Sequence, residues 1–434
     1  MPEGWEWTRL GSVFSTATGS TPSTKDSSLY GTDYPFYKPT DLDAGYNVLT
    51  SEDFVSKKGY CSGRQLPKFS VLVTCIGTIG KTGYIRKAGI CNQQINAILP
   101  TDEIMSEYVY FCMCSQFEQQ QIQMNSSATT LPILNKRKFD NLLFLIPPHK
   151  QQLLIVDKIQ SLLSSVDEIQ NNQAILRNTV TETKAKILDL AIRGKLVPQD
   201  SNDEPASVLL ERISSEKEEL IKQGKIKRDK KESVIFKGDD NSYYLRTGRV
   251  EESLEDWRFD DLPETWKICC LGELCDYGNC INVNTEDIAE DAWILDLEDI
   301  EKDTGTVLKK VTKNQRNSVS TKHKFHSGQV LYSKLRPYLN KVVLSDADGY
   351  CTSEILPLEF KNCVLPEYAR YYLMSGTFIA YANHCSYGVK MPRLGTTDGK
   401  KAIFSLPPLS EQKRIVETID FCFVQLNKIS EALA

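Results

Sequence analysis

The side chains best suited to chemistry in this sequence are cationic, and they gather in two stretches that hold no acidic residue. The first stretch lies between Asp53 and Asp102, and the second lies between Asp303 and Asp346. Lysine and arginine side chains pair with phosphates, so a basic stretch free of acids can follow a row of phosphate groups. The candidates are Lys57, Lys58, Arg64, Lys81, Arg86 and Lys87 in the first stretch, and Lys309, Lys310, Lys313, Arg316, Lys334, Arg336 and Lys341 in the second.

Two further features favour nucleic acid over an ordinary solvated surface for these stretches. Lys81 and Lys341 occupy matching places about 260 residues apart. Tyrosines that could stack on bases are interleaved with the cations, namely Tyr60, Tyr84, Tyr332 and Tyr338. A single basic run is usually solvated surface. Because the pattern occurs twice at matching positions, we interpret both stretches as nucleic-acid-binding surfaces.

Patterns for catalysis are weak. The segment from Gly77 to Thr82 resembles a phosphate loop, but only two residues separate its glycines where that motif has four. We therefore predict a turn between strands, with Lys81 free to meet a phosphate. Glu359-Phe360-Lys361, downstream of Asp346, has the loose spacing of a metal-dependent nuclease, but such short matches occur by chance in long chains.

The cysteine spacing and the absence of other catalytic motifs also indicate that the chain is not an enzyme. The pairs Cys112/Cys114 and Cys269/Cys270 lack the gap and the histidine partners of a zinc site, so we predict buried thiols. The sequence holds neither nucleophile-elbow nor dinucleotide-binding motifs, and it lacks the Asn/Asp-Pro-Pro-Tyr/Phe signature of adenine methyltransferases. We therefore expect no catalytic residue, no metal site and no cofactor in this chain.

Composition limits the class of protein. The chain has 434 residues, 41% of them hydrophobic and 25% charged, as is usual for globular proteins. Its net charge of −5 argues against a uniformly basic nucleic-acid binder, so local stretches must carry that function. No apolar run approaches the roughly 20 residues that span a bilayer, which excludes a membrane-spanning protein. The thirteen cysteines and the lack of a secretory signal lead us to expect a cytoplasmic protein with reduced thiols.

The chain contains a tandem repeat with an offset of about 260 residues. Trp5 recurs as Trp266, and Pro147-Pro148 recurs as Pro407-Pro408, each followed shortly by a Gln-Gln or Glu-Gln pair. A near-constant offset over such a length is hard to obtain by chance. We therefore predict two related globular domains, each followed by a Pro-Pro break and a helix.

Both predicted helices carry the apolar spacing of a coiled coil. Apolar residues at alternating steps of four and three form a seam that follows each Pro-Pro pair. The first helix is expected to end at Gly194, and the second seam is about half as long. The seam residues are Ile155, Ile159, Leu162, Val166, Ile169, Leu176, Val180 and Ile187 in the first helix, and Ile415, Ile419, Leu426 and Ile429 in the second. We predict that these two helices pair.

Short β-rich runs, glycine turns and helical stretches alternate within both repeats, which predicts the α+β class. A linker between the repeats is predicted to hold one charged amphipathic helix from Ala206 to Gln223, followed by a basic run at 225–231. The expected parts are a first domain at 1–148, a helix at 149–194, the linker at 195–260, a second domain at 261–408 and a short distal helix at 409–434.

Several of these motifs occur together in one known family. With its two Trp-containing domain starts, its two Pro-Pro helix starts and the helix end Ala191-Ile192-Arg193-Gly194-Lys195-Leu196-Val197-Pro198, the chain resembles the specificity subunit of type I restriction-modification systems. The resemblance covers essentially the whole chain. It implies that 1–148 and 261–408 are target-recognition domains, each of which reads one half of a split DNA sequence. It also implies that the two helices pair antiparallel.

The resemblance implies partners rather than catalysis. Besides duplex DNA, the expected partners are two methyltransferase subunits, which use S-adenosylmethionine to methylate adenine, and restriction subunits, which act as helicase-nucleases with ATP and Mg. On this basis we expect a non-catalytic subunit whose cofactors lie in its partners, with no membrane partner.

Two alternatives remain open from the sequence. The chain could be a coiled-coil scaffold that does not bind DNA, or a fused nuclease or methyltransferase with unrecognised motifs. DNA retention at low and high salt separates a DNA reader from a scaffold. Turnover of S-adenosylmethionine by the isolated chain separates an enzyme from a reader.

Overall fold

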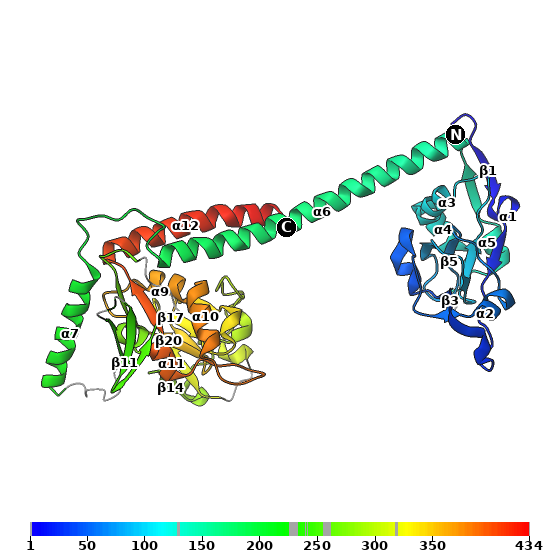
Figure 1. The fold of residues 1–434 in the computed structure, drawn as a ribbon. Coiled ribbons are helices and arrows are strands. Elements are labelled where there is room, and N and C mark those ends of the chain that lie inside the picture. Colours follow the sequence, from blue (N-terminus) through cyan, green and yellow to red (C-terminus); the bar gives the residue numbers. More distant parts are fainter. Residues whose placement is uncertain are drawn as a thin grey trace. The chain divides into compact units, whose positions relative to one another are not determined.

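The computed structural model describes residues 2–127, 131–224, 233–238, 240, 242–254, 262–316 and 320–433. The chain forms two compact units, Met1–Asn171 and Asn172–Ala434 (Figure 1). Both units combine helices and strands, which confirms the predicted α+β class. The basic run at 225–231 and the end of the linker at 255–260 lie outside the described residues.

The first unit contains three small sheets with helices packed on them. One sheet has the antiparallel order β2-β8-β5-β6, a second has the order β4-β3-β7, and β1 pairs with β9. The elements are β1 (Glu6–Arg9), α1 (Leu10–Val13), β2 (Thr16–Thr18), β3 (Tyr30–Tyr37), β4 (Phe54–Val55), α2 (Lys57–Ser62), β5 (Val71–Thr74), β6 (Thr82–Tyr84), β7 (Ile90–Cys91), β8 (Ile95–Ile98), α3 (Ser106–Cys114), α4 (Gln116–Asn125), α5 (Lys136–Asp140) and β9 (Leu143–Ile146).

The second unit repeats this plan and adds elements before it. Its described sheets have the orders β10-β11-β12, β14-β16-β19-β15 and β18-β17-β20, and β13 pairs with β21. The elements are α7 (Ala206–Lys222), β10 (Ser233–Lys237), β11 (Tyr243–Thr247), β12 (Val250–Ser253), β13 (Lys267–Cys270), α8 (Leu271–Leu274), β14 (Ile281–Val283), β15 (Ile294–Leu295), β16 (Lys322–Phe325), β17 (Val330–Ser333), β18 (Val342–Leu344), β19 (Gly349–Thr352), β20 (Ile355–Leu358), α9 (Pro366–Leu373), α10 (Gly376–His384), α11 (Thr396–Lys401), β21 (Ile403–Leu406) and α12 (Leu409–Ala432).

The tandem repeat predicted from sequence is present in the fold. The three strands β8-β5-β6 of the first unit correspond to β20-β17-β18 of the second, and the pair β1-β9 corresponds to β13-β21. Single contacts repeat as well. The Tyr108 hydroxyl donates to the carbonyl of Leu145 at 2.8 Å, and the Tyr368 hydroxyl donates to the carbonyl of Ser405 at 3.0 Å. Each tyrosine thereby ties a helix to the strand that precedes the Pro-Pro pair.

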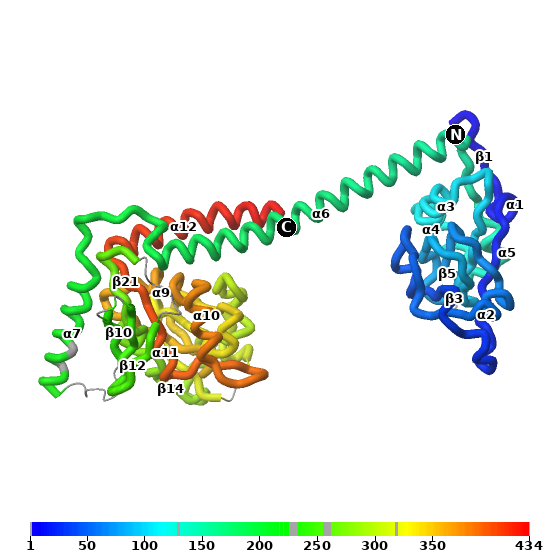
Figure 2. Tube along the Cα trace, in the orientation of Figure 1, coloured from blue at the N-terminus to red at the C-terminus, as the bar shows by residue number. Residues whose placement is uncertain are grey.

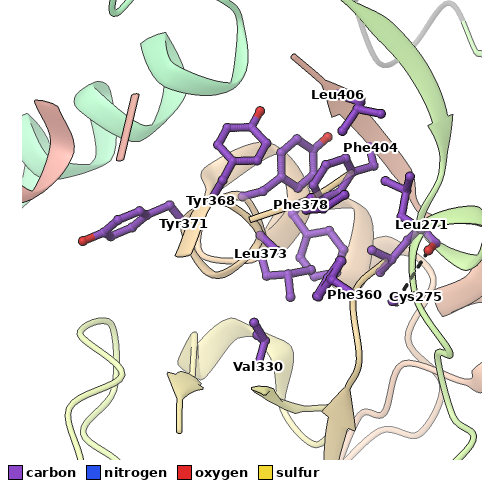
Figure 3. Packing of buried hydrophobic residues seen from close by; sticks show 14 of the residues in the cluster. Leu271, Cys275, Val330, Phe360, Tyr368, Tyr371, Leu373, Phe378, Phe404 and Leu406 are labelled. Atoms are coloured by element: carbon purple, nitrogen blue, oxygen red, sulfur yellow. Dashed lines mark hydrogen bonds between the residues drawn. The ribbon is translucent and has the colours of Figure 1, made fainter. Parts of the chain in front are cut away.

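A group of aromatic side chains lies in the core of the second unit. Tyr368 and Tyr372 of α9 pack against Phe404 of β21, with the Tyr372 and Phe404 ring centroids 4.1 Å apart. Figure 3 shows Phe360, Phe378 and neighbouring aliphatic side chains gathered around them. These buried rings pack α9 against β21.

A glutamine four residues after each Pro-Pro pair makes the same two backbone hydrogen bonds in both units. These bonds explain why the Pro-Pro and glutamine motif recurs. The Gln152 side chain accepts a hydrogen bond from the Met105 backbone N–H at 2.9 Å and donates to the Pro147 carbonyl at 3.0 Å. Gln412 does the same with Leu365 and Pro407, at 2.8 and 3.0 Å. Both glutamines are buried, so each satisfies backbone groups that water cannot reach. The motif therefore fixes the start of each long helix on its own domain.

Helix α6 (His149–Ile192) ends as predicted near Gly194. The Lys195 N–H donates to the Leu190 carbonyl at 2.9 Å, and the Gly194 N–H donates to the Ala191 carbonyl at 3.3 Å. This is the hydrogen-bond pattern of a Schellman motif, and it requires a left-handed residue at Gly194, whose φ is +66°. A side chain at Gly194 would also collide with Pro263, because its Cβ would lie 2.5 Å from that ring.

Helix α12 pairs antiparallel with the C-terminal part of α6, as Figures 1 and 2 show. Arg177 donates to the Leu433 carbonyl, and Lys184 Nζ donates to Asn427 Oδ1 at 2.7 Å. Of the predicted seam residues, Val180, Ile415 and Ile419 are buried, and Ile187 and Leu426 are half-buried. The prediction of a helix pair is confirmed for this stretch.

The part of the α6 seam before Arg177 is not covered by α12, as the shorter second seam predicts. Because α12 ends near Arg177, it cannot cover the residues before it, and Leu162, Val166, Ile169 and Leu176 are exposed. Ile155 is half-buried and packs against the core of the first unit, and Ile159 is also half-buried. Ile429 on α12 is exposed. Heptad spacing selects residues that can be buried, but burial requires a facing helix.

The linker prediction needs one correction. Besides α7, it contains the antiparallel sheet β10-β11-β12, which the sequence analysis missed. Leu245 of this sheet packs with Ile268 and Ile403 in a small core on the second domain. The described part of the linker is therefore partly integrated into the second unit.

Among the described residues, no helix is both long and apolar enough to cross a membrane.

Candidate nucleic-acid interface

The segment from Gly77 to Thr82 forms a turn that joins β5 to β6, as predicted. Gly77 and Gly80 both adopt positive φ, +79° and +87°. The Gly77 N–H donates to the Pro132 carbonyl at 3.0 Å, which ties the turn to a second loop. Lys81 follows directly, at the start of the returning strand.

The same turn occurs between β17 and β18 of the second unit, with other residues. We call residues 334–341 the basic turn. Arg336 and Asn340 take the two positive-φ positions, with φ of +50° and +49°. The left-handed conformation costs roughly 1 kcal/mol or more for a residue with a side chain, so glycine would be favoured there. Arginine at position 336 therefore makes the protein less stable than glycine would.

A second loop is tied to the basic turn. We call residues 386–393 the tip loop. Tyr387 and Arg393 form an antiparallel bridge, with N–H to carbonyl distances of 3.1 and 2.9 Å. The Arg336 N–H donates to the Pro392 carbonyl at 2.7 Å, which matches the contact between Gly77 and Pro132 in the first unit. The two loops therefore form one surface in the second unit.

The tip loop presents large side chains to solvent. Val389 has a relative exposure of 102%, Tyr387 of 62%, and Met391 is exposed beside them. Tyr338, at the centre of the basic turn, has a relative exposure of 50%. The tip loop was not predicted from the sequence, although Gly388 and Pro392 on either side of residues 389–391 are typical of a surface loop.

Three cations of this surface form no ion pair with a carboxylate of the described chain, although Lys334 helps to lower the pKa of Glu354. No described acid lies within ion-pairing distance of Lys334, Arg336 or Lys390, and the buried Nε atom of Arg336 has no described hydrogen-bond partner. Lys341 donates to the Leu297 carbonyl at 2.6 Å, and its burial lowers the pKa of this lysine. By contrast, Glu354 holds Arg393 through two hydrogen bonds from Nε and one from Nη2.

The remaining predicted cations of the second unit are held by acids. Lys310 pairs with Asp346 at 2.7 Å, Lys313 pairs with Glu290 at 2.9 Å, and Lys309 lies 3.7 Å from Asp299. These three groups are only partly available to phosphate.

Arg316 is the most deeply engaged of the predicted cations. Its guanidinium is almost buried and bonds to Asp296 and, at 2.5 Å, to Asp299. Burial alone would lower the pKa of Arg316, but its hydrogen bonds to Asp299 and Asp296 raise that pKa above the ordinary value. Arg316 therefore has a structural contact that explains its presence without DNA.

The first unit shows a similar division. Lys81 pairs with Asp43 at 2.6 Å, which corrects the prediction that this lysine is free, and Lys58 pairs with Asp26 at 3.2 Å. These ion pairs are at the surface, so each is weak and can be replaced by a phosphate. Arg64 donates to the Thr18 carbonyl at 2.5 Å, while the side chains of Lys57 and Lys87 are exposed.

Arg86 is held by aromatic rings. Its guanidinium lies 4.5 Å from the centroid of Tyr46 and 4.4 Å from that of Tyr84. Of the interleaved tyrosines, Tyr84 and Tyr332 are buried, and Tyr60 stacks on Tyr34 with centroids 4.0 Å apart. Tyr338 is thus the member of that set exposed enough to stack on a base.

The weak catalytic patterns have structural explanations. Lys361 Nζ donates to the Glu273 carbonyl at 2.6 Å, and Phe360 is part of the core. All thirteen cysteines are free thiols, and Cys269 and Cys270 are buried as predicted. Cys112 is half-buried, whereas Cys114 is exposed, which corrects the prediction for that residue. Burial raises the pKa of Cys112 to about 12, which disfavours the thiolate that binds metals.

The sequence is similar to that of known proteins. The family model for the type I restriction modification DNA specificity domain matches residues 2–177 and 263–432. The chain is 22% identical to the type I restriction enzyme EcoDI specificity subunit of Escherichia coli over 436 residues, which cover 99% of this chain and 84% of that protein. It is 28% identical to the EcoAI specificity subunit of Escherichia coli over 302 residues, 62% of this chain and 47% of that one.

The fold also matches a solved structure. The HsdS subunit from Thermoanaerobacter tengcongensis superposes with a TM-score of 0.57 at 16% sequence identity, over 100% of this chain and 93% of that one. The fold is therefore that of a protein with two related domains. The chain belongs to the type I restriction modification DNA specificity family, and its function is sequence-specific DNA recognition. The comparisons favour neither the scaffold nor the fused-enzyme alternative.

Proposed function

We propose that each domain reads one half of a bipartite DNA target through its turn and the loop tied to it. The observation that carries this proposal is the repetition of one arrangement in both units. In each unit two positive-φ residues shape the turn, a backbone hydrogen bond joins it to a proline of the second loop, and a lysine follows. A duplicated arrangement of this kind suits two separate contacts with duplex DNA.

The proposal assigns different roles to the cations. Lys334, Arg336 and Lys390 are expected to contact phosphates, together with the exposed Lys57 and Lys87. Four further lysines are expected to contribute less, because acids already partly neutralise them, namely Lys81, Lys309, Lys310 and Lys313. Arg316 is not assigned to DNA. The list of phosphate contacts is thereby narrower than the set of basic residues in the sequence.

We also propose that the chain itself is non-catalytic and acts with methyltransferase subunits and restriction subunits. This is supported by the relatives, which are specificity subunits of type I restriction enzymes. S-adenosylmethionine, ATP and Mg would then be bound by the partners. We further propose that the complex acts in the cytoplasm, which the free thiols support.

The half-site proposal is tested by exchanging one domain. The chain is co-expressed with its methyltransferase subunit, and adenine methylation is mapped on genomic DNA. Replacing residues 1–148 with the corresponding domain of a relative should change one half of the methylated sequence and leave the other half intact. If both halves change together, the domains do not read separate half-sites.

The phosphate role is tested with Arg336→Gly, because glycine is the residue that the first unit has at the matching position. This variant loses a cation but gains a residue suited to positive φ, so its thermal stability should not fall. Its affinity for duplex DNA should fall similarly for all sequences, and the salt slope should drop by about one. Lys310→Ala is the matched control and should bind almost normally. A complex that retained no duplex DNA even at low salt would favour the scaffold alternative.

A further inference from the structure

Val389, in the middle of the tip loop, has no structural role within the described chain. Its relative exposure of 102% means that the side chain is as accessible as in an extended peptide. An apolar side chain stabilises a fold by being removed from water. Because Val389 remains fully in water, it does not stabilise this fold. Met391 and Tyr387 are exposed beside it.

Hydrogen bonds hold the tip loop in place near Arg393, even though Val389 is exposed. Arg393 is fixed by Glu354, with an Nη2 to Oε1 distance of 2.8 Å, and it donates from Nη1 to the Met391 carbonyl at 3.2 Å. Gly388, with a φ of +95°, allows the chain to turn sharply just before Val389. The Arg336 N–H donates to the Pro392 carbonyl, and Leu394, directly after the loop, donates to the Lys334 carbonyl, so the loop is anchored to the basic turn. The loop therefore holds Val389 at a defined distance from the cations.

The chemistry of Val389 selects its partner. The side chain carries no donor for a phosphate, so it cannot contribute to backbone binding as its neighbour Lys390 can. Among the groups on base edges in the major groove, the C5-methyl of thymine is the apolar one. When the surrounding cations contact phosphates, an apolar side chain on a projecting loop is suited to enter the groove between them.

We propose that Val389 is a specificity-determining residue that contacts the methyl group of a thymine in the half-site read by the second domain. The inference rests on the proposed function, because it requires that the basic turn and tip loop face DNA. It adds the chemical identity of one group in the target. It also predicts that specificity and phosphate binding reside in different residues of the same loop, Val389 and Lys390.

The test uses the complex of the full chain with its methyltransferase subunit. Duplexes with randomised positions are selected by binding, and the enriched motif is sequenced for the wild-type protein and for Val389→Ala. The variant should lose its preference for thymine at one position of one half-site and keep the other half unchanged. Lys390→Ala should weaken binding to all sequences without altering the motif. Val250→Ala, at another exposed valine of the second unit, is the matched control and should behave as the wild type.

Replacement of thymine by deoxyuridine at that position completes the test. It should weaken binding of the wild-type complex about fourfold, the value for one buried methyl group, and should not affect Val389→Ala. The thermal stability of the variant should equal that of the wild type, because the side chain contacts no core residue. An unchanged motif, or a loss that is equal for all sequences, would overturn the assignment of Val389. If the wild-type complex itself enriches no bipartite motif, the proposed function fails instead.

Discussion

The indole Nε1 of Trp266 donates a hydrogen bond to the carboxylate of Glu411 at 2.9 Å, and both side chains are buried. The two residues are 145 positions apart in the sequence. In the first unit Trp5 donates in the same way to Gln151, 146 positions later. The bond joins the start of each domain to the first turn of its long helix, which explains why tryptophan and the Gln-Gln or Glu-Gln pair recur together.

Trp266→Phe should destabilise the protein because it leaves the buried carboxylate of Glu411 without one of its donors. Gln199 Nε2 still donates to it at 2.5 Å, so the expected loss is about 1–3 kcal/mol in the free energy of unfolding. Glu411→Gln is the control, since the first unit has glutamine at this place, and it should be tolerated. Urea unfolding followed by circular dichroism measures both. Equal stability of Trp266→Phe and the wild type would show that the bond contributes nothing.

Arg316→Met should destabilise the second unit without a direct effect on DNA contacts. The Asp299 side chain is buried, and Arg316 is its closest cation, so the substitution leaves a buried charge without its main partner. Removing one member of such a pair costs about 3–5 kcal/mol. Arg316→Met combined with Asp299→Asn should cost less than the two single substitutions added together. A double-mutant cycle on the free energy of unfolding measures this coupling, and simple additivity would argue against it.

Glu118 should make stability depend on pH. Burial raises the pKa of Glu118 from 4.5 to about 8, although a hydrogen bond from Gln121 lowers it in part. The folded state therefore holds a proton that the unfolded state releases above pH 4.5. This contribution to stability is complete below pH 4.5 and is lost as the pH rises to about 8. The neighbouring Tyr108 and Cys112 have raised pKa values as well and remain neutral in this range.

Glu118→Gln keeps the acceptor for Gln121 and removes the titration. The variant should match the wild type near pH 4.5 and become the more stable of the two as the pH approaches 8, by on the order of 4–5 kcal/mol. Thermal melting between pH 4.5 and 8.5 measures the difference. A constant offset between the two proteins over this range would contradict the assignment to Glu118.

The same substitution at two places on α6 should report where the helix is covered. Val180 has a relative exposure of 6%, and Val166 has one of 49%. Val180→Ala should therefore cost about 1–2 kcal/mol. Val166→Ala should be neutral or slightly stabilising, because alanine is the better helix former. Thermal melting of the two variants provides the comparison. Equal costs would indicate that α12 is not what buries Val180.

The sequence by itself determined the features that depend on local pattern and repetition. Heptad spacing and the Pro-Pro pairs predicted α6 and α12, and Gly194 predicted the end of α6. The near-constant offset predicted two related domains, and the glycines before Lys81 predicted a turn rather than a phosphate loop. These inferences held because helix periodicity, proline and positive φ are dictated by covalent geometry within a few residues.

Only the tertiary structure decided which of these residues are covered and which are free. Leu162 and Val180 share one seam pattern, yet α12 reaches only Val180. Arg316 and Arg336 lie in the same acid-free stretch, but Asp296 and Asp299 come from elsewhere in the fold to hold Arg316. Charge pairing and burial depend on contacts between residues that are distant in sequence. The sequence of a basic stretch therefore does not show which of its cations are ion-paired and which are free. The tip loop joined the basic turn for the same reason, because backbone hydrogen bonds across more than fifty residues bring Pro392 to Arg336.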